Sequence, residues 1–369
     1  MKAWPVLGIG IIQAILLIAH WFIYRTFIDF WSPLDAAWKQ DLSIAILALS
    51  FTFVISALLG FRFSNPVIRA VYTASAIWLG AANFLFLAAL LCWPLDLVFR
   101  VVPVDPPMPY VTGLLFALAI LAAVYGLVNA RWIRLRRLTV RLPNLPDSWR
   151  GRTAAMASDL HLGNLNGVAF GRRIATSIAR LKPDIVFLPG DFYDGSGADP
   201  DRLAAPFREL KPPLGTYYVT GNHEEFGNPA HYTEAIARAG IHVLANEKAD
   251  VDGVTILGIP WGDSTFPIRV KATLDKLHPG ADEPAILLLH APLRLPIVEQ
   301  AGVSLQLSGH THKGQLFPFT WLTRRIFGKF TYGLQRFGSL AVYTSSGAGT
   351  WGPPMRIGTA PEIVEIIFE

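Results

Sequence analysis

The sequence predicts an N-terminal all-α transmembrane bundle of four helices followed by an α/β domain. The first part carries four long apolar stretches, each near the ~20 residues that a helix needs to cross a bilayer. They cover residues 4–24, 42–61, 70–93 and 110–130. From residue 153 onward, short apolar runs alternate with amphipathic segments, which is the pattern of an α/β architecture. The chain thus divides into a membrane domain over 1–130, a basic, proline-containing linker over 131–152 and an α/β domain over 153–369.

The four apolar stretches indicate membrane spans rather than helices of a soluble core. Residues 9–19 and 81–92 contain no charged side chain, whereas a core helix at a surface carries charges on one face. A cleaved signal peptide is the alternative for the first stretch, but three more spans follow it and no clear small-x-small cleavage site follows Leu17. All four spans are therefore expected to be retained.

Basic residues predict the orientation of the spans, since Lys and Arg are retained on the cytoplasmic side. With the N-terminus inside, the basic residues on the inner side are Lys2, Arg62, Arg69, Arg131, Arg134, Arg136, Arg137 and Arg141. Those outside are Arg25, Lys39 and Arg100. The α/β domain is accordingly expected on the cytoplasmic side of the cell (inner) membrane. The basic cluster after the fourth span either attracts anionic lipid headgroups or serves only as the topology signal.

Composition limits the chemistry that the chain can use. Its single cysteine, Cys92, lies inside the third span, so neither disulfides nor cysteine metal ligands are expected. Any metal ion must then be held by nitrogen and oxygen atoms. The net charge of +5 comes partly from the basic cluster beside the fourth span, so it does not argue for a nucleic-acid partner.

Hydrophobic periodicity predicts the elements of the α/β domain in order. The expected strands are 153–158, 184–188, 215–219, 242–244, 254–259, 285–289, 303–307, 340–344 and 362–367. The expected helices are 168–181, 201–210, 229–239, 270–277 and 293–301. Polar side chains lie near the C-terminal ends of five strands: Asp159, Asp191, Asn222, His290 and His310. Because the ligand site of an open α/β sheet lies outside those ends, these side chains are expected to meet at one rim.

Five motifs in this domain carry a family resemblance. They are D-x-H at 159–161, G-D-x-x-D-G at 190–195, G-N-H-E at 221–224, a lone histidine at 290 and G-H-T-H at 309–312. With these motifs in this order, the chain resembles the calcineurin-like metallophosphoesterase superfamily, in particular its membrane-attached bacterial branch. The resemblance implies an α/β metallophosphoesterase domain of two packed β-sheets flanked by helices, with two metal ions at one edge.

The resemblance also implies which side chains bind the two divalent ions. The first ion would be bound by Asp159, His161, Asp191 and His312. The second would be bound by Asp191, Asn222, His290 and His310, with the Asp191 carboxylate bridging the pair. Carboxylate, amide and imidazole ligands suit Mn²⁺, Fe²⁺ or Zn²⁺. Two such ions can hold a hydroxide between them for in-line attack on a phosphoester or pyrophosphate.

Three neighbouring acidic and basic residues receive further roles. His223 is the family-matched donor of a proton to the leaving oxygen, and Asp194 is expected to orient its imidazole. Taken alone, Asp191 and Asp194 could instead be turn formers in a Gly-rich loop. Glu224 is expected to cap a helix that begins nearby; the alternative is a contact with a histidine of the site.

Two features after the G-H-T-H motif bear on the substrate. Lys313 either binds a second phosphate beside the metal ions or is a solvated loop lysine. The segment 315–338 mixes large apolar side chains with Arg324, Arg325 and Lys329. It could therefore lie against the bilayer at the mouth of the site, or pack onto the α/β domain as an insertion.

Attachment to a membrane favours a substrate that is also in the membrane, because tethering raises the effective concentration. The expected partners are membrane lipids and a lipid-linked or small-molecule phosphoester, and the resemblance makes UDP-2,3-diacylglucosamine the sharpest candidate. A broad-specificity phosphodiesterase or phosphomonoesterase is the enzyme alternative. A membrane sensor or scaffold with a regulatory phosphoesterase domain is the alternative of another class. Nucleic acid is not expected, because the basic residues cluster at the membrane boundary and after His312 rather than around an aromatic-lined groove.

Overall fold

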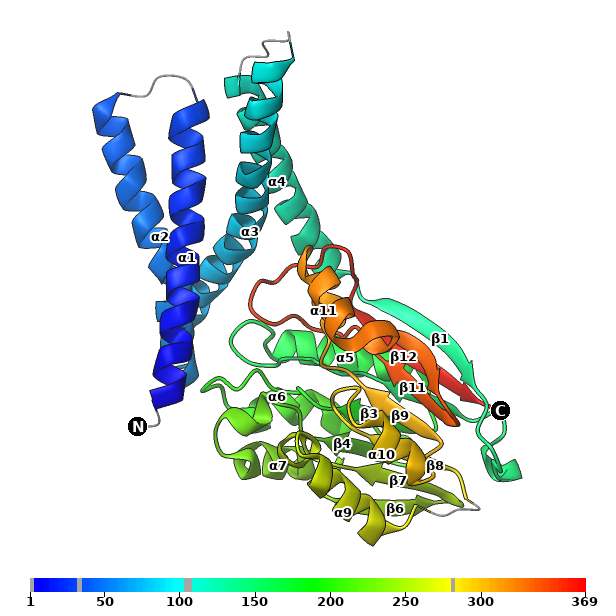
Figure 1. The fold of residues 1–369 in the computed structure, drawn as a ribbon. Coiled ribbons are helices and arrows are strands. Elements are labelled where there is room, and N and C mark those ends of the chain that lie inside the picture. Colours follow the sequence, from blue (N-terminus) through cyan, green and yellow to red (C-terminus); the bar gives the residue numbers. More distant parts are fainter. Residues whose placement is uncertain (1–2, 32–34, 103–107, 280–282) are drawn as a thin grey trace. The chain divides into compact units, whose positions relative to one another are not determined.

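The computed structural model describes residues 3–31, 35–102, 108–279 and 283–369. Lys2, one of the basic residues expected on the inner side of the membrane, lies outside the described residues. The chain divides into two compact units. The first comprises Met1–Val128 and Gly352–Met355, and the second comprises Asn129–Trp351 and Arg356–Glu369. Figure 1 colours the elements of both units along the chain.

Four long helices form the first unit. They are α1 (Ala3–Phe30), α2 (Ala36–Arg62), α3 (Pro66–Val101) and α4 (Met108–Arg131). Each is long and apolar enough to cross a membrane, which confirms the expectation of four N-terminal spans. The side chains of Asp35 and Asn65 accept main-chain N–H groups at the start of α2 and α3. These caps explain why both helices begin where they do.

Polar side chains inside the helical unit have partners within it. The His20 ring donates from Nδ1 to the Leu16 carbonyl oxygen at 2.8 Å, and its Nε2 accepts from Trp78 Nε1 at 2.9 Å. Trp93 Nε1 donates to Thr26 Oγ1 at 2.9 Å. Polar groups at membrane depth need such partners because lipid offers none. His20 is therefore explained as a helix-packing residue.

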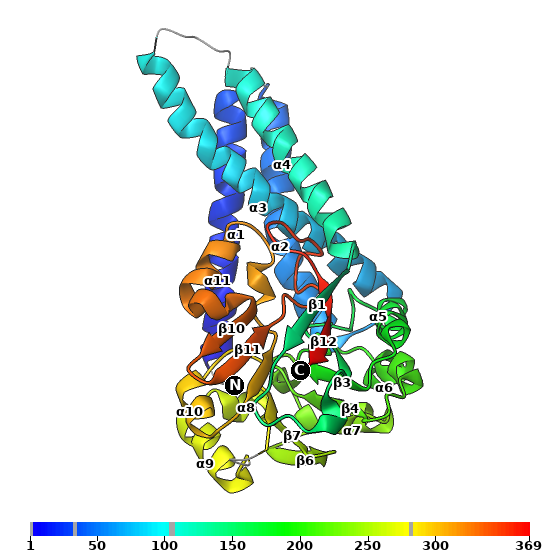
Figure 2. The same cartoon turned by 90° about the vertical axis from the view of Figure 1, so that its right-hand side faces the viewer.

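Two six-stranded sheets form the framework of the second unit, and Figure 2 shows them from a second direction. The first sheet has the order β1 (Arg134–Val140), β12 (Glu362–Phe368), β2 (Thr153–Met156), β3 (Ile185–Pro189), β4 (Thr216–Val219) and β5 (His242–Val243). The second has the order β10 (Gly333–Phe337), β11 (Leu340–Thr344), β9 (Leu305–Ser308), β8 (Ala285–Leu288), β7 (Val254–Gly258) and β6 (Glu247–Val251). Strands β2 to β5 are parallel to one another, and so are β7, β8, β9 and β11.

Helices cover the outer face of each sheet. The α-helices are α5 (Val168–Leu181), α6 (Pro200–Ala204), α7 (Pro229–Arg238), α8 (Trp261–Ser264), α9 (Pro267–Leu277), α10 (Leu295–Gln300) and α11 (Phe319–Phe327). Short 3-10 helices are η1 (Asp147–Trp149), η2 (Ala205–Glu209), η3 (Glu224–Phe226), η4 (His312–Gly314) and η5 (Gly328–Thr331). In β3, Phe187 faces the core between the sheets, whereas Val186 and Leu188 face the core beneath α5 and α7. Burial on both faces explains the continuous apolar strand sequences.

The layers therefore stack as helices, sheet, sheet and helices, which confirms the expected fold class. One core lies between the sheets, a second lies under α5, α6 and α7, and a third lies under α9 and α10. The parallel strands of both sheets end in the loops that carry the five motifs. The fold thus delivers residues that are distant in the sequence to one edge.

The expected linker 131–152 requires a correction, because it contains strand β1. This strand pairs in parallel with β12 from Arg134 opposite Glu362 to Val140 opposite Phe368. Its arginines suggested a linker, but β1 is an edge strand and most of its side chains are exposed. Arg137 forms an ion pair with Glu365 on the neighbouring strand. Strands β6 and β10 and helix α11 are further elements that were not expected.

Candidate metal centre

The predicted ligands come from loops at the ends of five strands. Asp159 and His161 follow β2, Asp191 follows β3, Asn222 follows β4, His290 follows β8, and His310 and His312 follow β9. Three groups of side chains in the described part of the chain have ligand atoms that all lie within 4.8 Å of one another. They are Asp159, His161 and His312; His161, Asp191 and His223; and Asp191, His290 and His310. Asn222 joins the third group, since its Oδ1 lies 3.0 Å from His310 Nδ1.

Most of these ligands sit in left-handed backbone. The φ angles are +53° for Asp159, +47° for His161, +50° for Asp191, +68° for His310 and +47° for His312. Such a conformation costs on the order of 1–3 kcal/mol for a residue other than glycine, and it persists only where the surroundings impose it. Here it turns the chain sharply at the strand end, so that side chains of separate loops face one another. The backbone conformation of these loops thus determines where the ligand side chains lie.

Asp191 connects the two halves of the site. In the first half, the Nε2 atoms of His161 and His312 are 2.9 Å apart, and His161 Nε2 lies 3.8 Å from Asp191 Oδ2. In the second half, the same Oδ2 atom lies 3.1 Å from His290 Nε2. Asp159 Oδ1 contacts both halves, at 3.5 Å from His312 Nε2 and 4.0 Å from His290 Nε2. One carboxylate oxygen of Asp191 therefore faces ligands of both groups.

The residues fit a pair of divalent cations. Asp159 Oδ2 is buried and has no hydrogen-bond partner among the described residues. Ring nitrogens of His161 and His312 face each other at 2.9 Å, which two lone pairs tolerate only with a shared cation or proton. Buried carboxylates are costly unless positive charge compensates them. The nitrogen and oxygen donors are those that borderline divalent ions accept. Mn²⁺, Fe²⁺ and Zn²⁺ all accept these donors.

Burial sets the protonation states of the histidines. It lowers the pKa values of His161 and His312 well below their usual range, and together with the nearby His290 it lowers that of His310 to about 3. These three imidazoles are therefore neutral, as metal binding requires. Burial opposes protonation of His290 too, but the Asp191 and Asp159 carboxylates raise its pKa to about 10. The Asp159 and Asp191 carboxylates thus stabilise a positive charge beside His290.

Glycines in the motifs leave room for the ligands. A Cβ atom on Gly221 would lie 2.1 Å from Asp191 Oδ1 and 2.4 Å from Asp191 N. A Cβ on Gly190, whose φ is +86°, would lie 2.5 Å from His290 Nδ1. His290 Nδ1 itself donates to the Pro189 carbonyl oxygen at 2.8 Å, which leaves Nε2 for the site. The first glycines of G-D-x-x-D-G and G-N-H-E are therefore required because a side chain at either position would collide with a ligand residue.

Glu224 does not cap a helix, contrary to expectation. Its fully buried carboxylate accepts main-chain N–H groups from Asp191 at 3.1 Å, Tyr193 at 2.8 Å and Gly221 at 2.7 Å. Burial raises the pKa of this carboxyl to about 8. Glu224 thereby joins the loop after β3 to the loop after β4. Neither of the two roles considered from the sequence describes this main-chain tie.

The pairing of His223 with Asp194 also differs from the expectation. His223 lies at the first half of the site, with its ring centroid 4.6 Å from that of His161. Its Nδ1 pairs with the main-chain carbonyl oxygen of Asp194 at 3.0 Å. The Asp194 carboxylate instead accepts N–H groups from Asn164 at 2.9 Å and Ser196 at 2.8 Å. The main chain, rather than the carboxylate, therefore orients the imidazole.

Arg356 is a residue of the site that the sequence analysis missed. Its side chain is fully buried and donates to the carbonyl oxygens of His312, at 3.0 Å, and Gly349. It also lies 3.1 Å from His312 Nδ1, and no carboxylate pairs with it in the described residues. Burial lowers its pKa to about 10, so it remains a cation at neutral pH. A lone arginine outside any motif gave no signal in the sequence.

Aromatic side chains border the site. Phe226 and Trp351 are each 58% exposed, and their rings lie 4.7 and 5.8 Å from that of His223. Trp261 lies 4.9 Å from the His310 ring on the other side. Exposed aromatic surface beside buried ligands is typical of a site that binds a partly apolar ligand.

Lys313 contacts an aromatic ring. Its Nζ lies 4.5 Å from the centre of the Tyr332 ring, and its backbone has a φ of +50°. This cation–π contact gives the ammonium group a partner within the domain. A role for Lys313 in phosphate binding stays a prediction.

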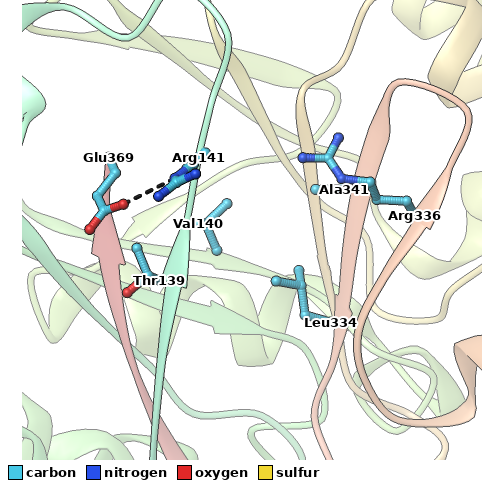
Figure 3. Close-up of a pocket in the computed structure, with 7 residues that line it drawn as sticks. All are labelled: Thr139, Val140, Arg141, Leu334, Arg336, Ala341 and Glu369. Carbon is cyan, nitrogen blue, oxygen red and sulfur yellow. Dashed lines mark hydrogen bonds and ion pairs between the residues drawn. The ribbon is translucent and has the colours of Figure 1, made fainter.

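A separate cavity of about 450 Å³ opens elsewhere in the second unit (Figure 3). Its lining comes from β1, β10, β11 and the end of the chain: Thr139, Val140, Arg141, Leu334, Arg336, Ala341 and Glu369. An ion pair of 3.1 Å between Arg141 and Glu369 lies at one side. None of the predicted ligands lines this cavity, so it is distinct from the metal centre.

Two packed sheets with buried Asp and His clusters at their strand ends define the metallophosphoesterase class. Comparison with known proteins agrees. Residues 153–314 match the model of the family described as calcineurin-like phosphoesterase. The chain belongs to the calcineurin-like phosphoesterase family.

Individual relatives show how far the similarity extends. A zebrafish (Danio rerio) transmembrane protein with metallophosphoesterase domain is 33% identical over 70% of this chain and 62% of its own length. A Campylobacter jejuni metallophosphoesterase is 29% identical over 65% of each chain. A metallophosphoesterase of Aquifex aeolicus is 30% identical over 68% of this chain and 98% of its own. The chain thus spans less than two thirds of the first two relatives.

Proposed function

We propose that the protein is a membrane-bound phosphoesterase that works with two divalent metal ions. The observation that carries this proposal is Asp191 Oδ2, which faces His161 of one ligand group and His290 of the other. In this proposal one ion would be held by Asp159, His161, Asp191 and His312, and the other by Asp191, Asn222, His290 and His310. Two bound cations would neutralise phosphoryl oxygens and activate water for attack on phosphorus.

His223 is the proton donor in this proposal. As the bond between phosphorus and the leaving oxygen breaks, the protonated His223 ring gives its Nε2 proton to that oxygen and keeps its other proton on Nδ1. A water oxygen bonds to phosphorus and releases one proton to the solvent. The Asp194 carbonyl oxygen holds Nδ1 at 3.0 Å and so aims Nε2 away from the main chain. Glu224 and Arg356 fix the loops that carry the ligands.

The proposed substrate is a lipid-linked phosphoester or pyrophosphate such as UDP-2,3-diacylglucosamine, and membrane lipids are the proposed partners. Four spans keep the site at a membrane, and exposed Phe226 and Trp351 offer apolar surface beside His223. The similarity to a Danio rerio transmembrane protein with metallophosphoesterase domain supports attachment to a membrane, and the similarity to C. jejuni and A. aeolicus metallophosphoesterases supports a bacterial branch. We place the catalytic domain on the cytoplasmic side of the inner membrane, on the charge asymmetry of the spans.

Two other functions compete with this one. A broad-specificity phosphodiesterase or phosphomonoesterase would use the same metal centre on soluble substrates. A membrane sensor or scaffold would not need turnover at all, so Asp191→Asn would leave its biological role intact. The complete set of buried ligands favours an enzyme.

The decisive experiment measures manganese-dependent hydrolysis by the detergent-purified full chain. It compares UDP-2,3-diacylglucosamine, its deacylated head group and a soluble chromogenic diester, with Asp191→Asn as the blank. A strong preference for the acylated compound supports the lipid pyrophosphatase. Equal or faster turnover of the soluble diester supports the broad-specificity enzyme, and no turnover of any phosphoester by the metal-loaded chain contradicts the proposal. A reporter fused after Glu369 tests the orientation.

A further inference from the structure

Helix α11 exposes a line of large apolar side chains. None of its nine residues is buried. Phe319 is 48% exposed, Leu322 54% and Ile326 65%. These three residues are spaced at i, i+3 and i+7, so they share one face, which we call the apolar stripe of α11. Trp321, 68% exposed, adds further apolar surface beside it.

The partly buried residues of α11, Thr320, Thr323 and Phe327, lie on a neighbouring side of the helix, and this side is fixed to the domain. A Cβ atom on Gly314 would lie 2.4 Å from Thr320 Cα, so the backbone of α11 directly contacts the loop that carries His312. The Phe327 ring lies 6.0 Å from the His310 ring, and Thr331 Oγ1 donates to the Thr323 carbonyl oxygen at 3.3 Å. The outward direction of the apolar stripe is therefore set by packing against the metal centre.

Positive charge accompanies the stripe. Arg324 and Arg325 lie in the last turn of α11 and are exposed, and the helix contains no acidic residue. Among the residues that the structure describes, no carboxylate forms an ion pair with either arginine. An apolar face flanked by arginines is the composition of helices that lie in the headgroup region of anionic membranes.

We propose that α11 docks onto the surface of an anionic lipid bilayer. Phe319, Leu322 and Ile326 enter the boundary between headgroups and acyl chains, and Arg324 and Arg325 contact lipid phosphates. The occupant is a bilayer because four spans of the same chain keep this domain beside one at high effective concentration. The charge of the arginines complements anionic headgroups.

Docking would have a direct effect on the site. Since the α11 backbone contacts the His312 loop, a helix seated in the headgroups brings the metal centre to the lipid surface. A substrate held in that surface would then reach Asp191 and His223 without leaving the membrane. The docking itself does not depend on which phosphoester is cleaved, so it can be tested apart from the proposed function.

Site-directed spin labelling of the full chain tests the docking. Cys92, the only cysteine, is replaced by alanine, and a nitroxide is attached at Leu322→Cys or Ile326→Cys. The protein is reconstituted in phosphatidylcholine vesicles with or without phosphatidylglycerol. Collision of the nitroxide with oxygen and with a water-soluble nickel chelate is then measured. Leu334→Cys, on strand β10 of the same unit and 39% exposed, is the matched control.

A docked stripe predicts labels at 322 and 326 that are accessible to oxygen and shielded from nickel in phosphatidylglycerol vesicles, while the label at 334 stays accessible to nickel. The double variant Arg324→Gln with Arg325→Gln should weaken the shielding. Free access of nickel at 322 and 326 would overturn the proposal, because the stripe would then lie in water. Shielding from both reagents would overturn it too, because that pattern indicates a protein partner. An unchanged far-UV circular dichroism spectrum confirms that each variant is folded, without reference to its activity.

Discussion

The His223 imidazole is held by the main-chain carbonyl oxygen of Asp194, at 3.0 Å from Nδ1, while the Asp194 carboxylate binds the amides of Asn164 and Ser196. The residue expected as a charged partner of His223 therefore acts on it through the backbone. A carbonyl oxygen fixes the tautomer and the ring orientation without adding a negative charge. The proton donor and the loop that supports it can thus be tested separately.

Replacing the proposed proton donor should slow the chemical step. We expect His223→Asn to reduce kcat by about 10²–10⁴-fold, the usual contribution of a general acid. The loss should be much smaller for a nitrophenyl ester, because nitrophenolate leaves without a proton. Steady-state kinetics with an alkyl and a nitrophenyl ester of the same phosphate measure the difference. Equal losses on both substrates would show that His223 has another role.

Asp194→Asn should affect stability more than catalysis. The amide can accept one of the two N–H groups that the carboxylate now accepts, and the carbonyl contact to His223 is unchanged. We expect a loss of ~1–3 kcal/mol in the free energy of unfolding, as for a weakened hydrogen bond to a buried charge. The fall in kcat should stay far below that of His223→Asn. A fall in kcat as large as that of His223→Asn would show that the Asp194 carboxylate does orient the His223 imidazole.

Glu224→Gln should loosen both ligand loops. The glutamine side chain places an NH₂ group among three main-chain donors, at Asp191, Tyr193 and Gly221, which leaves buried donors without acceptors. Metal affinity should fall about 10–100-fold, as when an outer partner of a ligand is lost. Titration of the metal-free chain with Mn²⁺ or Zn²⁺ measures this change. The neighbouring Glu225→Gln, whose carboxylate accepts from the Thr220 hydroxyl, is the control and should bind metal nearly as well as the original chain.

Gly221→Ala should displace Asp191. The new methyl group would lie 2.1 Å from Asp191 Oδ1, so the bridging carboxylate or its loop must move. We expect loss of tight metal binding, measured as bound metal per chain. Gly171→Ala is the control: its Cβ would make ordinary contacts of 3.4 Å or more, and alanine favours the helix α5 in which it lies. Retention of two ions by the Gly221 variant would mean that the loop relaxes freely.

Removal of metal should destabilise the second unit. Cations that bind only the folded chain add ~2.7 kcal/mol at a concentration one hundred times their Kd. We expect a chelator to abolish hydrolysis and to lower the melting temperature seen by calorimetry. Restoring two ions per chain should reverse both effects. Unchanged melting after verified metal loss would show that His290 protonation alone balances the buried carboxylates.

The sequence predicted the parts of the fold that repeat a simple pattern. The four spans and the buried strands, such as β3 with its apolar residues on both faces, followed from hydrophobicity alone. Strand β1 was missed because it lies at the edge of its sheet, where arginine side chains remain in water. In such a strand, burial does not decide the residue type, so the apolar pattern is lost. Helix α11 was missed although Phe319, Leu322 and Ile326 have helical spacing, because the helix has only nine residues and lies in a segment interpreted as a loop.

For the site, the motifs predicted which side chains meet but not how the loops are tied together. Asp159, Asp191 and His290 lie together as expected. The roles of Glu224 and of the Asp194 carbonyl rest on main-chain N–H and C=O groups, which every residue carries. Because any residue type can supply the main-chain group, the sequence does not show which residue is the partner. Arg356 meets the site only because the fold returns its loop to His312.

The pairing of β1 with β12 can form only late in the synthesis of the chain. Arg137 and its partner Glu365 are 228 residues apart. At ~5–20 residues per second, β1 waits on the order of 10–50 s after leaving the ribosome before its neighbour is made. During that time the chain is already anchored by its spans, and the flank of β2 that β12 will cover is open. A ribosome that stalls before residue 362 would leave an unfinished sheet fixed to the bilayer, exposed to chaperones and proteases that act at the membrane.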